Sequence, residues 1–310
     1  MAAGCDAVYE GRPGGHARSG PTSATTGGVS GTMDTVGQVG QAEQGRQRKP
    51  ATAARMYDYY LGGVHNFPAD REAAERIIAQ FPLFPAVARE NRAFLHRVVR
   101  HLAGAGVRQF LDIGSGIPTV GNVHEIVQAE VPDARVVYVD IDPVAVAESL
   151  EILEGNDLAI AIRADLCDPQ RILEHPQVRE LLDFEQPIAL LLAAVLHFVP
   201  DDAKAYEVVG RLVDALPPGS YLAISAAAAE SFAPSGAQTQ AVIDVYRQRT
   251  TTSAASRTKS KMVRFFAGLE LVAPGVVWLY QWPDPERALP DPFGGDATRC
   301  GEWAGLGRKE

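Results

Sequence analysis

Two glycines separated by one residue follow a short apolar run that carries an aspartate. The segment 110–116 reads FLDIGSG, with Asp112 near the end of the run and Gly114 and Gly116 after it. Glycines directly after a strand let the backbone approach a ligand, because no Cβ is in the way. A carboxylate here would repel a pyrophosphate but would suit a positively charged ligand, such as the ammonium and sulfonium groups of S-adenosylmethionine. A glycine pair of this kind can also be a tight turn and nothing more.

A second carboxylate, Asp140, ends the next apolar run. A carboxylate at that place can accept hydrogen bonds from both hydroxyls of a ribose. Its alternative role is to cap the helix predicted from Pro143, but Asp142, directly before that proline, fills the role better. The pattern therefore predicts that Asp140 binds ribose.

A third carboxylate, Asp165, follows the third apolar run, where the adenine of the same ligand would lie. Its alternative role, capping a helix from Pro169, is better served by Asp168. Because parallel strands end at one edge of a sheet, the three acids are expected to face one crevice. A nicotinamide-binding GxGxxG loop would need a glycine where this chain has Thr119, which disfavours a dinucleotide.

Candidates for the chemistry itself are fewer. Transfer of a methyl group from a sulfonium is an in-line displacement, in which the protein aligns the reactants and, where needed, removes a proton. His197 follows the fourth apolar run, and a histidine with a pKa near neutrality suits a general base. Its alternative is a structural, hydrogen-bonded histidine.

Four further residues stand in a glycine-containing segment before the first expected helix: Tyr57, Tyr60, His65 and Asn66. This composition suits a mobile cover over a ligand, or over a substrate beside it. For the two tyrosines, a packed aromatic cluster is an equal alternative. Arg92 lies on the polar side of a helix, where it could pair with a carboxylate, but a solvated surface arginine is the commoner outcome and is expected.

Apolar runs that alternate with amphipathic segments must position these residues. Strands are predicted at 109–113, 135–140, 159–164, 188–195 and 221–225, and later at 276–282 and 303–308. Helices are predicted at 71–81, 89–102, 122–130, 143–153, 169–182, 202–216, 238–249 and 259–266. Apolar strands separated by helices indicate a doubly wound α/β fold with a mostly parallel sheet.

The composition of the chain indicates its domain organisation and limits its partners. Residues 1–50 are rich in Gly, Ser, Thr, Ala and Gln and are expected to be a disordered, low-complexity tail before one domain at 51–310. The net charge of −9 argues against a nucleic-acid partner. The three cysteines are widely spaced, and no His, Cys or acid cluster has metal-ligand spacing, so neither disulfides nor a metal are expected. Without a signal or membrane-spanning run, we expect a cytoplasmic protein.

The chain from residue 51 onward resembles the S-adenosyl methyltransferases of the class I superfamily, long catalogued as a domain of unknown function. The resemblance rests on the segments RMYDYYLGG (55–63), HNF (65–67), NRAFL (91–95), LDIGSGIP (111–118), YVDIDP (138–143) and VLHFVPD (195–201). It implies a Rossmann-like, seven-stranded sheet whose last two strands form an antiparallel pair, with a helical cover at 51–104.

The resemblance also implies which residues contact the cofactor. Asp112, Gly114, Ser115 and Gly116 would hold the methionine end. Asp140 and Ile141 would hold the ribose and its surroundings, and Asp165 with Leu166 the adenine. The segment 250–260, rich in Ser and Thr, departs from the family's more apolar pattern.

The sequence thus predicts an S-adenosylmethionine-dependent methyltransferase that acts on a small molecule of unknown identity. A protein that binds the cofactor or its product without catalysis, as a sensor or scaffold, is the alternative. An NAD-dependent oxidoreductase is disfavoured by Asp112 and Thr119. The sequence makes no prediction about the oligomeric state.

Overall fold

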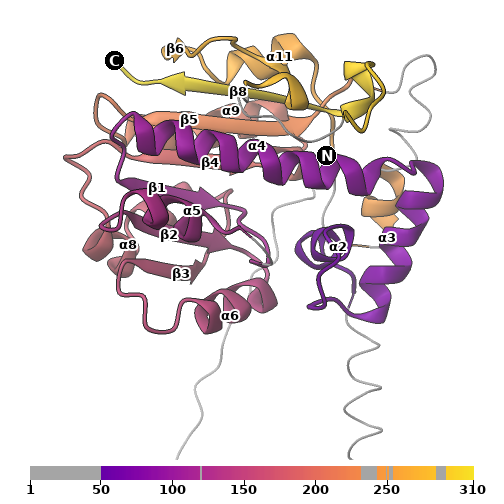
Figure 1. The fold of residues 1–310 in the computed structure, drawn as a ribbon, viewed down its shortest axis with the longest axis horizontal. Helices are drawn as coiled ribbons and strands as arrows, with labels where there is room; N and C mark the ends of the chain where they lie inside the picture. Colours follow the sequence, from indigo (N-terminus) through magenta and orange to yellow (C-terminus); the bar gives the residue numbers. More distant parts are fainter. Residues whose placement is uncertain (1–49, 119–120, 232–242, 249, 251–253, 284–290) are drawn as a thin grey trace, which may run out of the picture. The chain divides into compact units, whose positions relative to one another are not determined.

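One mixed sheet organises the described residues (Figure 1). The computed structural model describes residues 50–118, 121–231, 243–248, 250, 254–283 and 291–310. Apart from Pro50, the expected tail therefore lies outside the described residues, as do Thr119 and part of the helix expected at 238–249. The chain divides into two units, and everything described belongs to the second, Gln44–Glu310.

Within the described residues the sheet has eight strands in the order β3-β2-β1-β4-β5-β8-β6, and β7 also pairs with β8. Neighbouring strands from β3 to β5 are parallel, whereas β8 runs antiparallel to β5, β6 and β7. The strands are β1 (Gln109–Ile113), β2 (Arg135–Asp140), β3 (Ala159–Arg163), β4 (Ala189–Ala193), β5 (Tyr221–Ala227), β6 (Glu270–Leu271), β7 (Val277–Trp278) and β8 (Glu302–Arg308). This arrangement confirms the predicted mostly parallel sheet with antiparallel pairing at its C-terminal end.

Helices cover both faces of this sheet. They are α2 (Ala53–Tyr60), α3 (Pro68–Gln80), α4 (Phe84–Gly104), α5 (Val123–Glu130), α6 (Pro143–Ile152), α7 (Pro169–Leu173), α8 (Pro176–Leu181), α9 (Asp202–Asp214) and α11 (Lys259–Arg264). Short 3-10 turns occur at η1 (Leu196–Phe198), η2 (Leu279–Gln281) and η3 (Ala297–Cys300).

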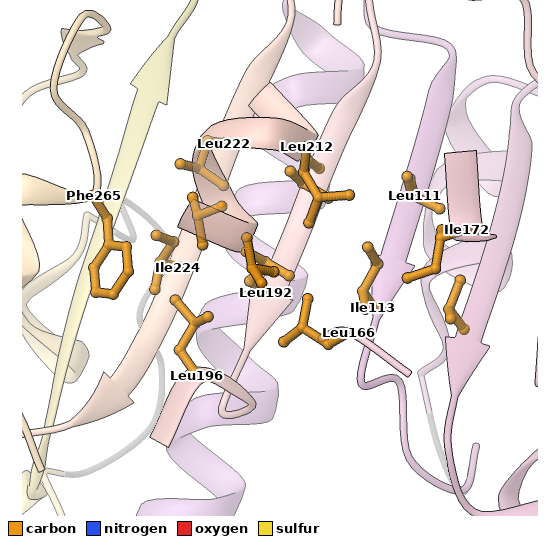
Figure 2. Close-up of a cluster of buried hydrophobic side chains, with 14 of the residues drawn as sticks. Leu111, Ile113, Leu166, Ile172, Leu192, Leu196, Leu212, Leu222, Ile224 and Phe265 are labelled. Carbon is orange, nitrogen blue, oxygen red and sulfur yellow. The ribbon is translucent and has the colours of Figure 1, made fainter. Parts of the chain in front are cut away.

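Side chains on the two faces of the sheet build two separate cores, because successive strand residues point to opposite sides. Leu111 and Ile113 of β1 pack toward α7, α8, α9 and α11 in the cluster of Figure 2. Phe110 packs on the opposite face, against α4 and α5. Asp112, which alternates with Leu111 and Ile113, therefore lies on the α4 face of the sheet.

A third apolar cluster holds the N-terminal helices together. Met56 and Tyr60 of α2 pack with Ile77 of α3, Ala88 of α4 and the distant Tyr246. Figure 1 places α2 and α3 beside the carboxyl ends of the parallel strands. These helices therefore lie at the edge of the sheet where the three acids were expected.

Two predicted elements are wrong in detail, and one helix was not predicted. The helix expected at 169–182 is split into α7 and α8, because Pro176 has no N–H to continue the first helix and disfavours helical backbone before it. The strand expected at 276–282 shortens to β7, after which η2 turns the chain so that Trp282 packs on Phe94 of α4. Helix α2 was not predicted, because a helix of eight residues depends on tertiary packing more than on propensity.

Candidate cofactor site

The loop after β1 is shaped by its two glycines. Gly114 and Gly116 have φ of 77° and 67°, the left-handed region that favours glycine. A Cβ on Gly114 would lie 2.3 Å from Cγ2 of Val195, in the segment after β4, whereas a Cβ on Gly116 would meet no atom within 4 Å. Gly114 therefore allows close packing between two loops, and Gly116 leaves room for a ligand.

Asp140 joins this loop to the end of β2. Its two carboxylate oxygens accept hydrogen bonds from the backbone N–H groups of Gly116 and Asp142, both at 2.8 Å. Burial raises the pKa of Asp140 to about 6, while those N–H groups oppose the rise. Asp140, the residue predicted to bind ribose, is thus held in a fixed position between the loops after β1 and β2.

Asp112 and Ser115 lie at the same edge of the sheet. Asp112 is buried, and burial raises the pKa of its carboxyl group to about 7, against the opposing influence of Arg92. The backbone N–H groups of Gly114 and Ser115 both donate to the carbonyl oxygen of Val139 in β2, at 2.8 and 3.2 Å. The nearby carboxylate of Asp140 also raises the pKa of Asp112, so the site holds a concentrated negative charge when both groups ionise.

The predicted adenine side is more exposed. Asp165 is exposed and accepts a hydrogen bond at 2.8 Å from the N–H of Cys167, while Leu166 is buried. Ile141 is 58% exposed, which leaves an apolar side chain uncovered beside Asp140. An adenine ring would cover such a side chain.

The helix caps follow the sequence prediction. The carboxylate of Asp142 accepts the N–H of Val144 at 2.9 Å in the first turn of α6. Asp168 accepts the N–H of Arg171 at 3.3 Å in the first turn of α7. Both capping predictions are confirmed, so Asp140 and Asp165 are not needed as caps.

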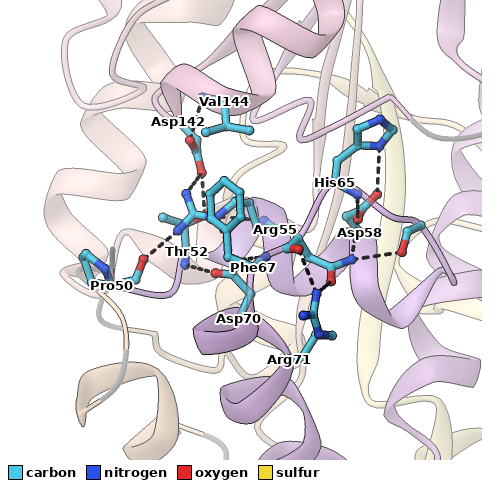
Figure 3. Close-up of polar contacts among 12 residues, drawn as sticks. Pro50, Thr52, Arg55, Asp58, His65, Phe67, Asp70, Arg71, Asp142 and Val144 are labelled. Atoms are coloured by element: carbon cyan, nitrogen blue, oxygen red, sulfur yellow. Dashed lines mark hydrogen bonds and ion pairs between the residues drawn. The ribbon is translucent and has the colours of Figure 1, made fainter. Parts of the chain in front are cut away.

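A buried ionic network ties α2 to this site (Figure 3). Arg55 donates from Nε to Asp70 at 2.8 Å, from Nη1 to Asp142 at 3.1 Å and from Nη2 to the carbonyl oxygen of Pro50 at 2.6 Å. The hydroxyl of Thr52 also donates to Asp142. The N–H of Asp142 in turn donates to Asp140. Asp142 therefore connects α2 to the residue that is predicted to bind ribose.

The segment after α2 is held by Asp58. This buried carboxylate accepts the backbone N–H of His65 at 2.9 Å and the side-chain amide of Asn66 at 2.8 Å. The His65 ring lies 3.2 Å from the carboxylate of Glu148 on α6. His65 and Asn66 therefore pack beside the loop after β2, and their proposed part in covering a ligand stays a prediction.

The tyrosines of α2 have two different environments. Tyr60 packs on Phe84 with a ring-centroid distance of 4.8 Å, within the third apolar cluster. The hydroxyl of Tyr57 donates to the carbonyl oxygen of Ala88 and accepts from the side-chain amide of Asn91, both at 2.9 Å.

Asn91 continues this chain of hydrogen bonds to the sheet. It accepts a hydrogen bond at 2.5 Å from Ser225 of β5, whose hydroxyl oxygen accepts the N–H of Ala194 at 2.9 Å. Ala194 has φ of 52°, a strained value for a residue with a Cβ, and it directly follows β4. The segment that leads to His197 is therefore held in an unusual conformation.

His197 lies in η1, close to that strained residue. Its Nδ1 is buried without a hydrogen-bond partner, and burial together with Arg257 lowers the pKa of the ring to about 3. Arg257 is itself 1% exposed and donates to the carbonyl oxygens of Leu196 and Val199 on either side. The Ser- and Thr-rich composition of the segment 250–260 gives no sign that its arginine is buried.

Two further residues of the site were not predicted. Arg92 was expected to be a solvated surface residue, which is wrong: it is half-buried, and its guanidinium carbon lies 5.9 Å from the centroid of the Tyr57 ring. Glu302, the first residue of β8, is 9% exposed, and its Oε2 has no hydrogen-bond partner. Burial raises the pKa of Glu302 to about 8.

Glu302 and Arg92 both lie near α2. The carboxyl group of Glu302 raises the pKa of both Tyr57 and Tyr246 electrostatically, and Arg92 lowers that of Tyr57. Glu302 carried no signal in the sequence and Arg92 only that of a polar helix face, because the partners of both come from distant parts of the chain. Among the described residues, no group of three His, Cys, Asp or Glu side chains could hold a metal ion.

The sheet order, the glycine turn after β1 and the acids at the ends of β1 and β2 define the Rossmann-like class that binds S-adenosylmethionine. The chain belongs to the S-adenosyl methyltransferase family, whose model matches residues 40–310. The cofactor of this family is S-adenosylmethionine, as predicted from Asp112, Asp140 and Asp165.

Two solved structures are similar over most of the chain. A Thermobifida fusca protein described as a candidate methyltransferase is 40% identical, with 86% of this chain and 97% of that chain covered and a TM-score of 0.78. A Streptomyces avermitilis protein described as a member of the DUF574 family is also 40% identical, with 86% and 100% covered and a TM-score of 0.78. A search of curated proteins found no match. No helix within the described ranges has the length and apolar character to cross a bilayer.

Proposed function

We propose that this protein is an active enzyme that transfers the methyl group of S-adenosylmethionine to a small molecule. The observation that carries the proposal is the pair of buried carboxylates, Asp112 and Asp140, beside the open space at Gly116. Two acids that burial keeps at a raised pKa suit a ligand that brings positive charge and hydroxyl donors. When bound, the cofactor supplies a methyl group on a sulfonium.

The residues of the site fit the parts of this cofactor one by one. Asp140 would accept the ribose hydroxyls, and Asp112 would face the ammonium group, next to the backbone of Gly114, Ser115 and Gly116. Ile141 would pack on the adenine, with Leu166 and Asp165 at its far side. None of these contacts requires a phosphate group, and S-adenosylmethionine, the cofactor of the family, has none.

The acceptor would lie on the α2 side of the site. Tyr57, Tyr246 and Glu302 interact there, and the Phe198 ring lies 5.4 Å from that of Tyr246. This environment is apolar and aromatic with one unpartnered acid, so it suits a small molecule with an apolar body. The segment 57–66 borders it, in agreement with its proposed part in covering the ligands.

Two buried bases are candidates for removing a proton from the acceptor. His197, proposed from the sequence, has a pKa of about 3, whereas Glu302 has a pKa of about 8. A general base works best when its pKa is near the working pH. The structure therefore favours Glu302 for proton removal and leaves His197 as a neutral imidazole that can orient the acceptor.

Ligand binding tests the function first. Calorimetry is expected to show binding of S-adenosylmethionine and S-adenosylhomocysteine and no binding of NAD, because the carboxylates repel a pyrophosphate. Binding of NAD alone would contradict the proposal. Transfer of label from a radioactive methyl donor to the small-molecule fraction of a cell extract would then separate an enzyme from a sensor that only binds.

The pH dependence of that transfer distinguishes the two bases. Glu302 must be ionised to accept a proton, so turnover is expected to rise about tenfold per pH unit below its pKa and to level off above about pH 8. If His197 is the base, turnover at a saturating cofactor concentration should not change between pH 6 and 9, because its pKa of about 3 lies far below that range. We expect Glu302→Gln to lower turnover by about 10²-fold and to remove the rise with pH.

The matching change His197→Ala should leave cofactor binding nearly intact and lower turnover by about 10²-fold if the ring acts in catalysis. Unchanged turnover would reduce His197 to a structural residue. A variant of Glu302 whose pH profile equals that of the wild type would exclude Glu302 as the base.

A further inference from the structure

The charge of Arg92 reaches Asp112 in the candidate cofactor site, although the residue belongs to the polar side of α4. Its charge opposes the rise in pKa of three side chains on other elements, Asp112 at the end of β1, Tyr138 in β2 and Tyr57 in α2, and it helps to lower the pKa of His96 on α4 itself. Asp112 and Tyr138 are cross-strand partners, so these groups surround one small region. Arg92 is therefore a cation that could bind a negatively charged group of a ligand in this region.

Arg92 is not fully satisfied by the protein. Its Nε is buried without a hydrogen-bond partner, and no ion pair of 4 Å or less joins it to Asp112 within the described part of the chain. Arg55 provides the contrast, because its Nε, Nη1 and Nη2 all donate to oxygen atoms of the protein. A buried N–H donor without a partner is costly, so an incoming acceptor at this position would be bound favourably.

The charges of Asp112 and Arg92 are complementary to those of an amino acid. An α-amino carboxylate carries one ammonium and one carboxylate group, and the site offers one buried acid, Asp112, and one arginine, Arg92, whose Nε has no hydrogen-bond partner. A guanidinium binds a carboxylate with paired, charge-assisted hydrogen bonds. We propose that Arg92 binds the carboxylate of the cofactor's methionine moiety while Asp112 binds its ammonium group, an inference that rests on the proposed function.

Tyr57 gives this arrangement a fixed geometry. The guanidinium carbon of Arg92 lies over its ring, 5.9 Å from the ring centroid, and its hydroxyl is held by Ala88 and Asn91. Stacking on an aromatic face leaves the edge of a guanidinium free to donate hydrogen bonds. Helix α2 therefore holds Arg92 in place as well as bordering the acceptor side.

Two adenosine ligands test the proposal without knowledge of the acceptor. S-adenosylhomocysteine carries the amino acid, whereas 5′-methylthioadenosine has the same adenosine and sulfur but no amino or carboxyl group. In Arg92→Met, which keeps an unbranched side chain against Tyr57, we expect the Kd of S-adenosylhomocysteine to rise at least tenfold, equivalent to about 1.4 kcal/mol. The Kd of 5′-methylthioadenosine should change less than about twofold, and Arg92→Lys should recover part of the affinity.

Two controls frame this result. Arg100→Met removes a surface arginine of the same helix, 61% exposed, and should change neither Kd. Asp140→Asn should weaken both ligands, because both contain the ribose. Thermal melting of each variant checks that the fold is intact.

Equal weakening of both ligands in Arg92→Met would assign Arg92 a structural role and overturn the inference. Weakening of neither would also overturn it, and would point to the carboxylate of an acidic acceptor as the partner of Arg92. If the unaltered protein bound neither ligand, the proposed function itself would fail together with the inference. The ratio of the two affinities is thus the decisive quantity.

Discussion

Replacing Arg55 with methionine is expected to lower the free energy of unfolding by about 3–5 kcal/mol, since removing one partner of a buried ion pair leaves its charge uncompensated. Arg55 is 5% exposed, and its two acidic partners, Asp70 and Asp142, are equally buried. Without the guanidinium these two carboxylates would face each other in a region closed to water. The loss should be measured by urea unfolding at equilibrium.

The chain contains a matched control for this measurement. Arg76 forms an ion pair with Glu72 at the same distance, 2.8 Å, as Arg55 with Asp70, but its side chain is 49% exposed and that of Glu72 is 62% exposed. Because exposed pairs of this kind contribute about 0.3–0.5 kcal/mol, Arg76→Met should have almost no effect. Equal effects of the two substitutions would show that the α2 network does not stabilise the fold.

A second consequence of the α2 network concerns the ligand. The carboxylate of Asp142 is held by Arg55, and the N–H of Asp142 donates to Asp140. Release of Asp142 in Arg55→Met should therefore also weaken cofactor binding, although Arg55 itself is not proposed to touch the cofactor. This effect should be smaller than that of changing Asp140 directly.

Replacing Asp140 with alanine is expected to reduce cofactor affinity at least about tenfold, and by about 10²-fold if both ribose hydroxyls lose their acceptor. Each hydrogen bond to a charged group contributes on the order of 1.5–3 kcal/mol, and 1.4 kcal/mol corresponds to a factor of ten. The substitution also removes the acceptor for the N–H groups of Gly116 and Asp142, so the loops after β1 and β2 lose their connection. Calorimetric titration with S-adenosylhomocysteine measures the effect.

Asp168→Ala is the matched control for Asp140→Ala. It too removes a carboxylate that accepts a backbone N–H after a strand, but Asp168 is exposed and caps α7. Loss of a cap costs about 1 kcal/mol of stability and should leave cofactor affinity unchanged. If affinity were unchanged in the Asp140 variant as well, the ribose assignment would have to be abandoned.

Most of the sheet could be predicted from the sequence, because its signals are local. Strands β1 and β2 begin and end where the apolar runs 109–113 and 135–140 begin and end. The glycines after β1 and the aspartates before Pro143 and Pro169 act through backbone geometry and capping, which involve only neighbouring residues. Elements that depend on long-range contacts, such as α2 and the short β7, could not be placed in this way.

The chain's own sequence determined the positions of Asp112 and Asp140 and hence the class of cofactor, because a parallel strand and the loop after it are encoded within a few residues. Only the tertiary structure decided which charges are buried and what faces them. Nothing in the sequence around Arg55, Arg92 or Glu302 indicates that the charged side chain is withdrawn from water, yet α2, α4 and β8 bring them to one edge of the sheet. Burial and charge pairing depend on neighbours from distant parts of the chain, and these neighbours exist only once the helices have packed against the sheet.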